Sequence, residues 1–225
     1  MKDYRIIDLG TMPYDQAFAL QRREVERVQR GGDDVFLLVE HPHVITAGRN
    51  ADGSAITADR RLIEARGVQL TECDRGGDVT YHGPGQLVGY PILALEEDRR
   101  DIRRYVHDIE AVLIRTLGDF GVGARRHPEH RGAWVGDAKI ASVGIRISRW
   151  VTSHGFALNV NTDLSFFSLM DPCGIQGCEM TSIARLRGSA DMASVKHRIV
   201  HNFEAVFSRR ALMAESHPDI GVSNA

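Results

Sequence analysis

Hydrophobic residues recur at three- and four-residue steps along the helical stretches of the chain. The clearest stretch runs from Asp101 to Phe120, and its apolar positions are Ile102, Tyr105, Val106, Ile109, Leu113, Leu117 and Phe120. Residues 13–30 and 192–212 show a similar spacing, and residues 58–66 form a shorter stretch of the same kind. These patterns predict amphipathic helices that pack on a core through their apolar faces.

Short apolar runs between the helical stretches are typical of strands. They cover residues 4–9, 35–40, 68–73, 132–136, 139–148 and 151–160, with a hairpin connection at Arg149-Trp150, whereas 164–181 is irregular. Runs of strands between helices predict an α+β fold, in which helices pack on a mixed, largely antiparallel sheet. Because no stretch resembles a linker, we expect one domain over residues 1–215 and a flexible tail over 216–225.

Composition narrows the classes of protein. The 225 residues are 43% hydrophobic and 26% charged, with a net charge of −2, so nothing favours a nucleic-acid or membrane partner. The N-terminus is polar and no apolar run is long enough to span a bilayer. Three cysteines, an odd number, argue against a disulfide framework and for a reducing cytoplasm.

The stretch from Arg75 to Tyr90 reads R-G-G-D-V-T-Y-H-G-P-G-Q-L-V-G-Y and holds five of the chain's 22 glycines. Such a loop can lay backbone N–H groups against a ligand, with Arg75 and His82 as polar handles. Composition alone favours a tight hairpin between two strands. The sequence matches neither a phosphate-binding P-loop nor a dinucleotide fingerprint.

Two histidines flank Pro42 in His41-Pro42-His43. Histidines at this spacing could bind a metal ion. No cysteine or carboxylate cluster accompanies them at ligand spacing, so no metal site is predicted and a strand–turn–strand corner is favoured.

Cys173 follows a proline and precedes a glycine in Asp171-Pro-Cys-Gly-Ile175, which predicts a sharp, irregular turn. A cysteine on such a turn can be partly exposed, and a nearby cation would favour its thiolate. The ordinary alternative is a small buried hydrophobe. Cys178 lies five residues further on, without the C-x-x-C redox spacing, and Cys73 lies in a strand pattern typical of core.

A thiolate nucleophile needs an activating partner. Lysine is scarce, with Lys2, Lys139 and Lys196 against 25 arginines. Lys139 begins an apolar strand, where propensity alone favours a solvated strand end. The functional alternative is an ammonium that faces the site, stabilises a thiolate and exchanges protons with it.

Four segments together resemble the lipoyl(octanoyl) transferases. They are Glu40-His-Pro with Thr46-Ala-Gly-Arg49, the stretch from Arg75 to Tyr90, Lys139-Ile-Ala-Ser-Val-Gly144 with His154-Gly-Phe-Ala-Leu-Asn159, and Pro172-Cys-Gly-Ile175. They follow in the family's order, and the resemblance as a whole extends over most of the chain. Cys178 stands where the family pattern suggests a residue such as methionine.

The resemblance implies the fold of the lipoate and biotin protein ligases. It implies that Cys173 takes an octanoyl or lipoyl group from acyl carrier protein as a thioester, in the first step of endogenous lipoate synthesis. The acceptor would be a lysine of a lipoyl domain of a 2-oxoacid dehydrogenase or of the glycine-cleavage H protein. Lys139 would stabilise the thiolate and act as acid and base, without ATP or metal. The acyl chain would be walled by Arg75, Gly76, Gly77, Asp78, Val79, Thr80, Tyr81, His82, Ser142, Val143, Gly144, Gly155, Phe156 and Ala157.

Several alternatives remain open at this stage. An ATP-dependent ligase on the same fold would not need Cys173, and an amidotransferase would move octanoyl between lipoyl domains. A non-enzymatic module would bind an acyl chain without a covalent adduct. His82 could orient Lys139 or the acyl carbonyl, or be a hydrogen-bonded structural residue. We expect a monomer whose arginines dock acidic partners, with candidates at Arg22-Arg23, Arg60-Arg61, Arg103-Arg104 and Arg125-Arg126.

Overall fold

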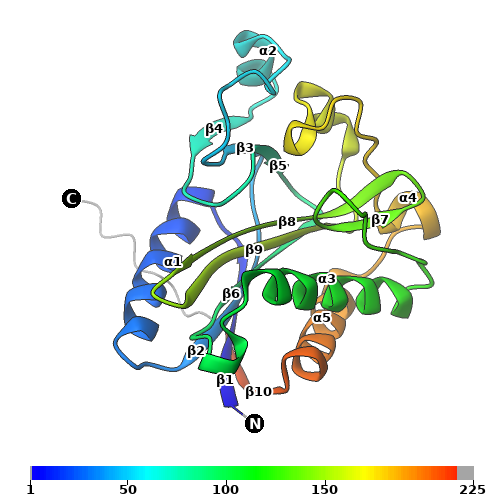
Figure 1. Cartoon of the computed structure of the whole chain (residues 1–225). Helices are drawn as coiled ribbons and strands as arrows, with labels where there is room; N and C mark the ends of the chain where they lie inside the picture. The colour runs from blue at the N-terminus through cyan, green and yellow to red at the C-terminus, as the bar shows by residue number, and fades with distance from the viewer. Residues whose placement is uncertain (1, 217–225) are drawn as a thin grey trace.

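The computed structural model describes residues 2–216, and a seven-stranded mixed sheet forms its centre (Figure 1). The strands lie in the order β10 (Arg209–Ser216), β1 (Lys2–Thr11), β2 (Asp34–Glu40), β6 (Gln86–Ile92), β9 (Val151–Asn159), β8 (Ala138–Ser148) and β7 (Ala133–Val135). β1 pairs in parallel with β10 and β2, and the other neighbours are antiparallel. This confirms the predicted α+β class.

Helices cover both faces of this sheet. α3 (Ile102–Asp119) and α5 (Met192–Phe207) pack together on one face, where Phe36 and Leu38 of β2 join their core. α1 (Tyr14–Gln29) lies on the other face against Val35 and Leu37. The alternation along β2 is the period-two pattern of a strand buried on both sides. The same arrangement separates α1 from α3 and α5 in Figure 1.

A second, three-stranded sheet lies beside the first, in the order β4 (Gln69–Glu72), β3 (Val44–Ala47) and β5 (Val79–His82). Its own apolar cluster includes Ile63 of α2 (Arg60–Ala65) and Phe166 of the 3₁₀ helix η2 (Leu164–Leu169). The remaining short helices are η1 (Glu97–Arg99), η3 (Pro172–Gly174) and α4 (Ile183–Arg187).

The glycine-rich stretch does not form the hairpin that composition favours. β5 and β6 flank the Gly83-Pro84-Gly85 turn, but β5 pairs with β3 whereas β6 pairs with β2 and β9. Gly85 has φ +76° and a Cβ there would lie 2.7 Å from the backbone of Asn161. Only glycine tolerates both conditions, so the turn carries the chain from one sheet to the other.

The predicted helix over 192–212 is too long. α5 ends at Phe207, Ser208 takes the left-handed conformation at φ 53°, and β10 follows. Arg209 pairs with Asp34, which is fully buried, and an unpaired buried carboxylate would be costly. This tertiary contact overrides the helical spacing. The predicted tail begins at Ser216, the last residue of β10, and 217–225 lie outside the described residues.

Candidate active site

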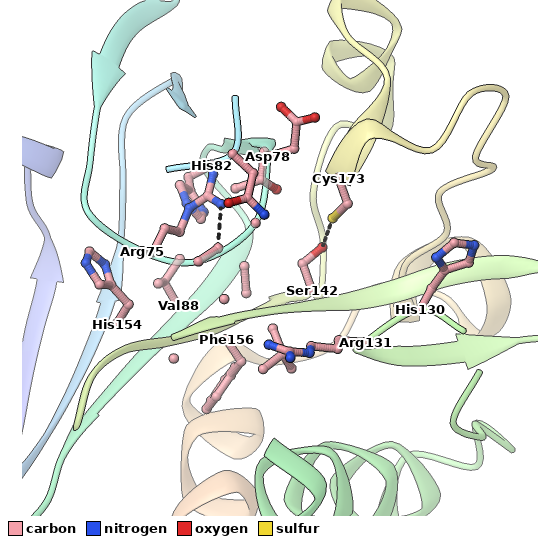
Figure 2. A pocket seen from close by; sticks show the side chains of 18 of the residues that line it. Arg75, Asp78, His82, Val88, His130, Arg131, Ser142, His154, Phe156 and Cys173 are labelled. Carbon is pink, nitrogen blue, oxygen red and sulfur yellow. Dashed lines mark hydrogen bonds between the residues drawn. The ribbon is translucent and has the colours of Figure 1, made fainter. Parts of the chain in front are cut away.

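A cavity of about 450 Å³ opens between the strands β8 and β9, the loop before β5 and the turn η3 (Figure 2). Most of the residues proposed from sequence line it. These are Arg75, Gly76, Gly77, Asp78, Thr80, His82, Lys139, Ser142, Val143, Gly144, Gly155, Phe156, Ala157 and Cys173. Four segments that are far apart in sequence therefore meet around one hollow.

Val79 and Tyr81 are the exceptions among the predicted wall residues. They alternate with Thr80 and His82 along β5, so their side chains leave the opposite face of the strand. Both belong to the apolar cluster of the small sheet, where the Tyr81 ring stacks on Phe166 at 5.1 Å. Neither residue lines the cavity, because a strand can offer only alternate side chains to one hollow.

Cys173 lies on the 3₁₀ turn η3 in a left-handed conformation, with φ 60°. Its backbone is held by short-range contacts: the N–H of Gly174 donates to Asp171 and that of Ile175 to Pro172. A Cβ at Gly174 would approach the Asp78 carboxylate to 2.6 Å. Left-handed geometry costs a non-glycine residue conformational energy and is concentrated at functional sites. The turn presents the thiol, which is half-buried, to the cavity.

Lys139 lies near the start of β8 and is only 2% exposed. Its Nζ donates to Cys173 Sγ at 3.0 Å and lies 5.4 Å from the centre of the Trp134 ring. Among the described side chains, no carboxylate lies within ion-pair distance of this amine. A buried ammonium without a counter-ion is costly, so Cys173 and the face of Trp134 are the neighbouring groups available to stabilise a charge on this amine.

Two more polar side chains, Ser142 and Arg75, line the cavity. The Ser142 hydroxyl lies 4.0 Å from Cys173 Sγ, on the same strand as Lys139. The Arg75 guanidinium donates to the Thr46 carbonyl at 2.7 Å and to its hydroxyl at 2.9 Å. A Cβ at Gly144 would approach Arg75 Cδ to 3.2 Å. Arg75 therefore links the glycine-rich loop to β3 by hydrogen bonds, and its side chain packs against Gly144, where a larger residue would crowd it.

His82 is buried, and its Nδ1 bonds the Gln86 side chain at 2.8 Å rather than Lys139. Burial lowers the pKa of His82 to about 3 and that of His41 to about 4. His41 bonds the Met12 carbonyl and the Tyr90 hydroxyl, whereas His43 bonds the Tyr81 hydroxyl. The arrangement matches the structural alternative for His82 and the corner predicted at Pro42.

The other two cysteines have different surroundings. Cys178 is half-buried and lines a separate surface hollow, and burial raises the pKa of its thiol. Cys73 follows β4, is half-buried rather than in a core cluster, and contacts the Ala47 carbonyl at 3.4 Å. Of the three, only Cys173 lines the cavity with a lysine in contact.

Several lining residues were not proposed from sequence. They are Tyr14, Val88, Tyr90 and His154, together with Arg49, Asn50, Glu129, His130, Arg131 and Ile175. Figure 2 shows His154 at the end of the pocket away from Cys173 and His130 at the other end. Five of them fall inside quoted segments, so position could have suggested them: Arg49, Val88, Tyr90, His154 and Ile175. Tyr14 begins a helix and Arg131 precedes a three-residue strand, and no local pattern marks either.

Comparison with known proteins defines the family. The family model described as "Lipoyl protein ligase A/B catalytic domain" matches residues 13–204. An octanoyltransferase of Solibacter usitatus is 45% identical over 217 residues, 96% of this chain and 98% of that protein. An octanoyltransferase of Syntrophobacter fumaroxidans is 47% identical and covers 91% and 90%.

Solved structures give the same fold. A bipartite lipoate protein ligase of Thermoplasma acidophilum superposes with a TM-score of 0.75 at 15% identity, over 97% of this chain and 89% of that one. A biotin protein ligase of Aquifex aeolicus reaches 0.52 at 13%, over 92% and 70%. The chain therefore belongs to the lipoyl protein ligase A/B catalytic domain family. Its similarity to octanoyltransferases over most of its length makes it an acyltransferase.

Proposed function

We propose that the chain moves an octanoyl or lipoyl group from acyl carrier protein, through a thioester on Cys173, to a lysine of a lipoyl domain. The acceptors would be 2-oxoacid dehydrogenase E2 subunits and the glycine-cleavage H protein. The observation that carries the proposal is the contact of 3.0 Å between Lys139 Nζ and Cys173 Sγ, both of which line the cavity. The chain is similar to octanoyltransferases over nearly their whole length, which supports octanoyl as the group that is transferred.

The first step forms the acyl-enzyme. The Cys173 thiolate attacks the carbonyl carbon of the donor thioester, and the bond from that carbon to the carrier's sulfur breaks. The departing thiolate takes a proton from the Lys139 ammonium, which lies beside the reacting sulfur. The products are the Cys173 thioester, the free carrier thiol and a neutral Lys139.

The second step makes the amide. The neutral amine of the acceptor lysine attacks the Cys173 thioester, and the carbon–sulfur bond breaks. Lys139 takes the proton that the attacking amine loses, and the cysteine leaves as its thiolate. One residue therefore serves as acid and then as base, and the ammonium–thiolate pair is restored for another cycle.

The oxyanion of each tetrahedral intermediate needs hydrogen-bond donors. The Ser142 hydroxyl, 4.0 Å from the sulfur, is the side chain best situated for this role, together with backbone N–H groups around Cys173 or of Ser142 to Gly144. Because a thioester is converted to an amide downhill, the proposed reaction requires neither ATP nor a metal ion.

The proposed partners are acidic proteins in the cytoplasm, docked to a monomeric enzyme. No helix among residues 2–216 is long and apolar enough to cross a membrane. Of the arginine pairs, Arg60 and Arg125 already contact carboxylates, whereas Arg22-Arg23 on α1 and Arg103-Arg104 on α3 are exposed. These two exposed pairs are therefore the candidates that we favour for docking.

Intact-mass analysis tests the proposal. After mixing with octanoyl-acyl carrier protein, the wild type should gain the mass of one octanoyl group, and Cys173→Ala should gain none. Lys139→Ala should gain it slowly. Addition of a lipoyl domain should then discharge the adduct and shift the domain by the same mass. A wild type that never acquires the group on Cys173 would rule out the transfer.

The same assay separates the alternatives. Transfer by Cys173→Ser that depends on ATP and free octanoate would support a ligase. Acceptance of octanoyl from an octanoylated lipoyl domain, but not from the carrier protein, would support an amidotransferase. Octanoate that is bound but never covalently attached would support a binding module.

A further inference from the structure

The inner end of the cavity is closed by His154. This residue lies within β9, is only 2% exposed and lines the cavity together with Tyr14 and Tyr90. Figure 2 shows His154 on the opposite side of the pocket from Cys173, with Arg75 and Val88 between them. An acyl chain that starts at the sulfur and follows the strands therefore points toward the imidazole.

The length available matches eight carbons. Ser142, which lies near the sulfur, pairs with Ala157 across the β8–β9 hairpin, and Ile145 pairs with His154. The three intervening steps span roughly 10 Å at the usual rise per strand residue. An extended eight-carbon acyl chain measures about 9 Å from carbonyl to methyl, given carbon–carbon bonds of about 1.5 Å. Longer chains would meet the His154 ring.

Charged groups hold that ring in place. The His154 Nε2 bonds Asp74 Oδ1 at 2.7 Å, and Arg146 pairs with the other oxygen of the same carboxylate. The hydrogen bond from His154 lowers the pKa of Asp74, so the carboxylate remains an acceptor at neutral pH. Moving the ring aside would break a hydrogen bond to a charged group, which is stronger than one between neutral groups.

The backbone and the neighbouring ring also fix His154. Its N–H donates to the side chain of Gln21 at 3.0 Å, and its ring stacks on Phe18 at 5.5 Å, both on α1. Its φ is +55°, a left-handed conformation that is uncommon for a histidine inside a strand. Such strain persists where the surroundings over-determine the conformation, as they do here, and it is concentrated at functional sites.

We infer that His154, anchored by Asp74 and Arg146, is the stop that limits the acyl chain to eight carbons. The inference rests on the proposed function and adds its chain-length selection. His154 is a specificity-determining residue in this account, since it contacts the methyl end of the substrate and none of the reacting atoms. Asp74 and Arg146 act through it as positioning residues.

Removal of the stop tests the inference. In His154→Gly the imidazole is absent and the left-handed backbone costs nothing, so the variant should fold. We expect its ratio of kcat/KM for dodecanoyl- over octanoyl-acyl carrier protein to rise at least about tenfold, the scale on which apolar pockets discriminate chain length. Asp74→Asn, which keeps the volume and weakens the anchor, should shift the ratio in the same direction by less.

The matched control is His43→Ala. His43 is a half-buried histidine, and it bonds Tyr81 on the side of β5 that faces away from the cavity. Its loss should leave the dodecanoyl-to-octanoyl ratio unchanged. A general loss of stability lowers the rate with both donors equally, whereas only a stop residue changes their ratio.

A second measurement separates this inference from the proposed function. Calorimetry with free octanoate and dodecanoate in a Cys173→Ala background measures the ratio of binding constants without any transfer. If the wild type forms no octanoyl adduct but His154→Gly shifts this ratio toward dodecanoate, the transfer fails and the stop stands. If octanoyl is transferred and neither ratio changes, or if His43→Ala changes them equally, His154 is not the stop.

Discussion

Lys139 and Cys173, which are in contact at the proposed reaction centre, come from regions of opposite character. Lys139 lies on β8, an eleven-residue strand that at that position pairs with Trp134 of β7 on one side and bridges to Met180 on the other. Cys173 lies on η3, a three-residue turn with a left-handed backbone, in a segment where Gly174 and Gly177 also have positive φ. The lysine is fixed by regular pairing and the cysteine by local turn geometry.

This difference suggests a division of labour. A proton carrier that is buried against an aromatic ring must stay where it is, because a small displacement would leave its charge unpaired. A nucleophile must be reachable by two bulky partner proteins in turn, and a projecting turn provides that access. The comparison predicts that substitutions in the two regions affect the same reaction through different steps.

Replacement of the nucleophile should have the largest effect. Cys173→Ser keeps the shape of the turn but removes the thiolate, and we expect octanoyl transfer to fall by a factor of at least about 10³. Cys178→Ser, in the same segment, should stay within about threefold of the wild type, since it changes no group at the cavity. Steady-state transfer to a lipoyl domain measures both. Equal losses would mean that the segment, not the thiol at 173, is responsible.

Removal of the buried amine comes next. Lys139→Met should lower transfer by about 10²–10⁴-fold, the usual contribution of a positioned acid or base. The variant should fold, because an apolar side chain replaces a buried charge. Alkylation of Cys173 by iodoacetamide at pH 7 should slow, with mass spectrometry identifying the site. Unchanged alkylation together with lost transfer would restrict Lys139 to proton transfer.

Acid should lower the stability of the protein through the two buried histidines His41 and His82. His41 and His82 have pKa values of about 4 and about 3, below an unfolded value near 6.5. The unfolded chain therefore binds more protons, and the free energy of unfolding should fall as the pH drops from 6.5 toward these values. The slope is about 1.4 kcal/mol per pH unit for each histidine. Urea titrations should show a shallower slope in His82→Gln, and an identical slope would contradict this account.

Removal of the Trp134 ring, which faces Lys139, should have the smallest effect on transfer. Trp134→Leu removes the aromatic face that lies 5.4 Å from Lys139 Nζ, an interaction worth about 0.5–2 kcal/mol. Transfer should therefore drop by roughly 2- to 30-fold, and Trp134→Phe should recover part of it. The indole N–H has no hydrogen-bond partner among the described residues, so its loss adds no broken bond. Full activity in the leucine variant would show that the thiolate alone stabilises the ammonium.

Local pattern predicted the elements that carry a strong period. The stripe over Asp101 to Phe120 became α3, and the apolar runs on either side of Arg149-Trp150 became the β8–β9 hairpin. Pattern failed where a distant partner decided the outcome. Residues after Phe207 continue an apolar spacing, but they pair with β1, where Arg209 forms an ion pair with the buried Asp34. The sequence Gly83-Pro84-Gly85 predicts a turn, but it does not show that the strands on either side belong to different sheets.

The residues of the site were predicted by resemblance more than by physics. Propensity favoured a solvated Lys139, whereas the folded chain buries it against Cys173, 34 positions away. The sequence also could not show that Asp74 meets His154 across 80 positions. Such contacts depend on sheet order, which no local period encodes.

The strand β5 separates the cavity on one of its faces from the apolar cluster of the small sheet on the other. Thr80 and His82 face the hollow that holds the thiol, while Val79 and Tyr81 support the apolar interior of the smaller sheet. Inserting or deleting one residue just before Val79 would exchange the two faces of the strand. Thr80 and His82 would then enter the apolar cluster, and Val79 and Tyr81 would fill the cavity. The length of the segment 75–78, which precedes β5 and lines the cavity, is therefore as constrained as its composition.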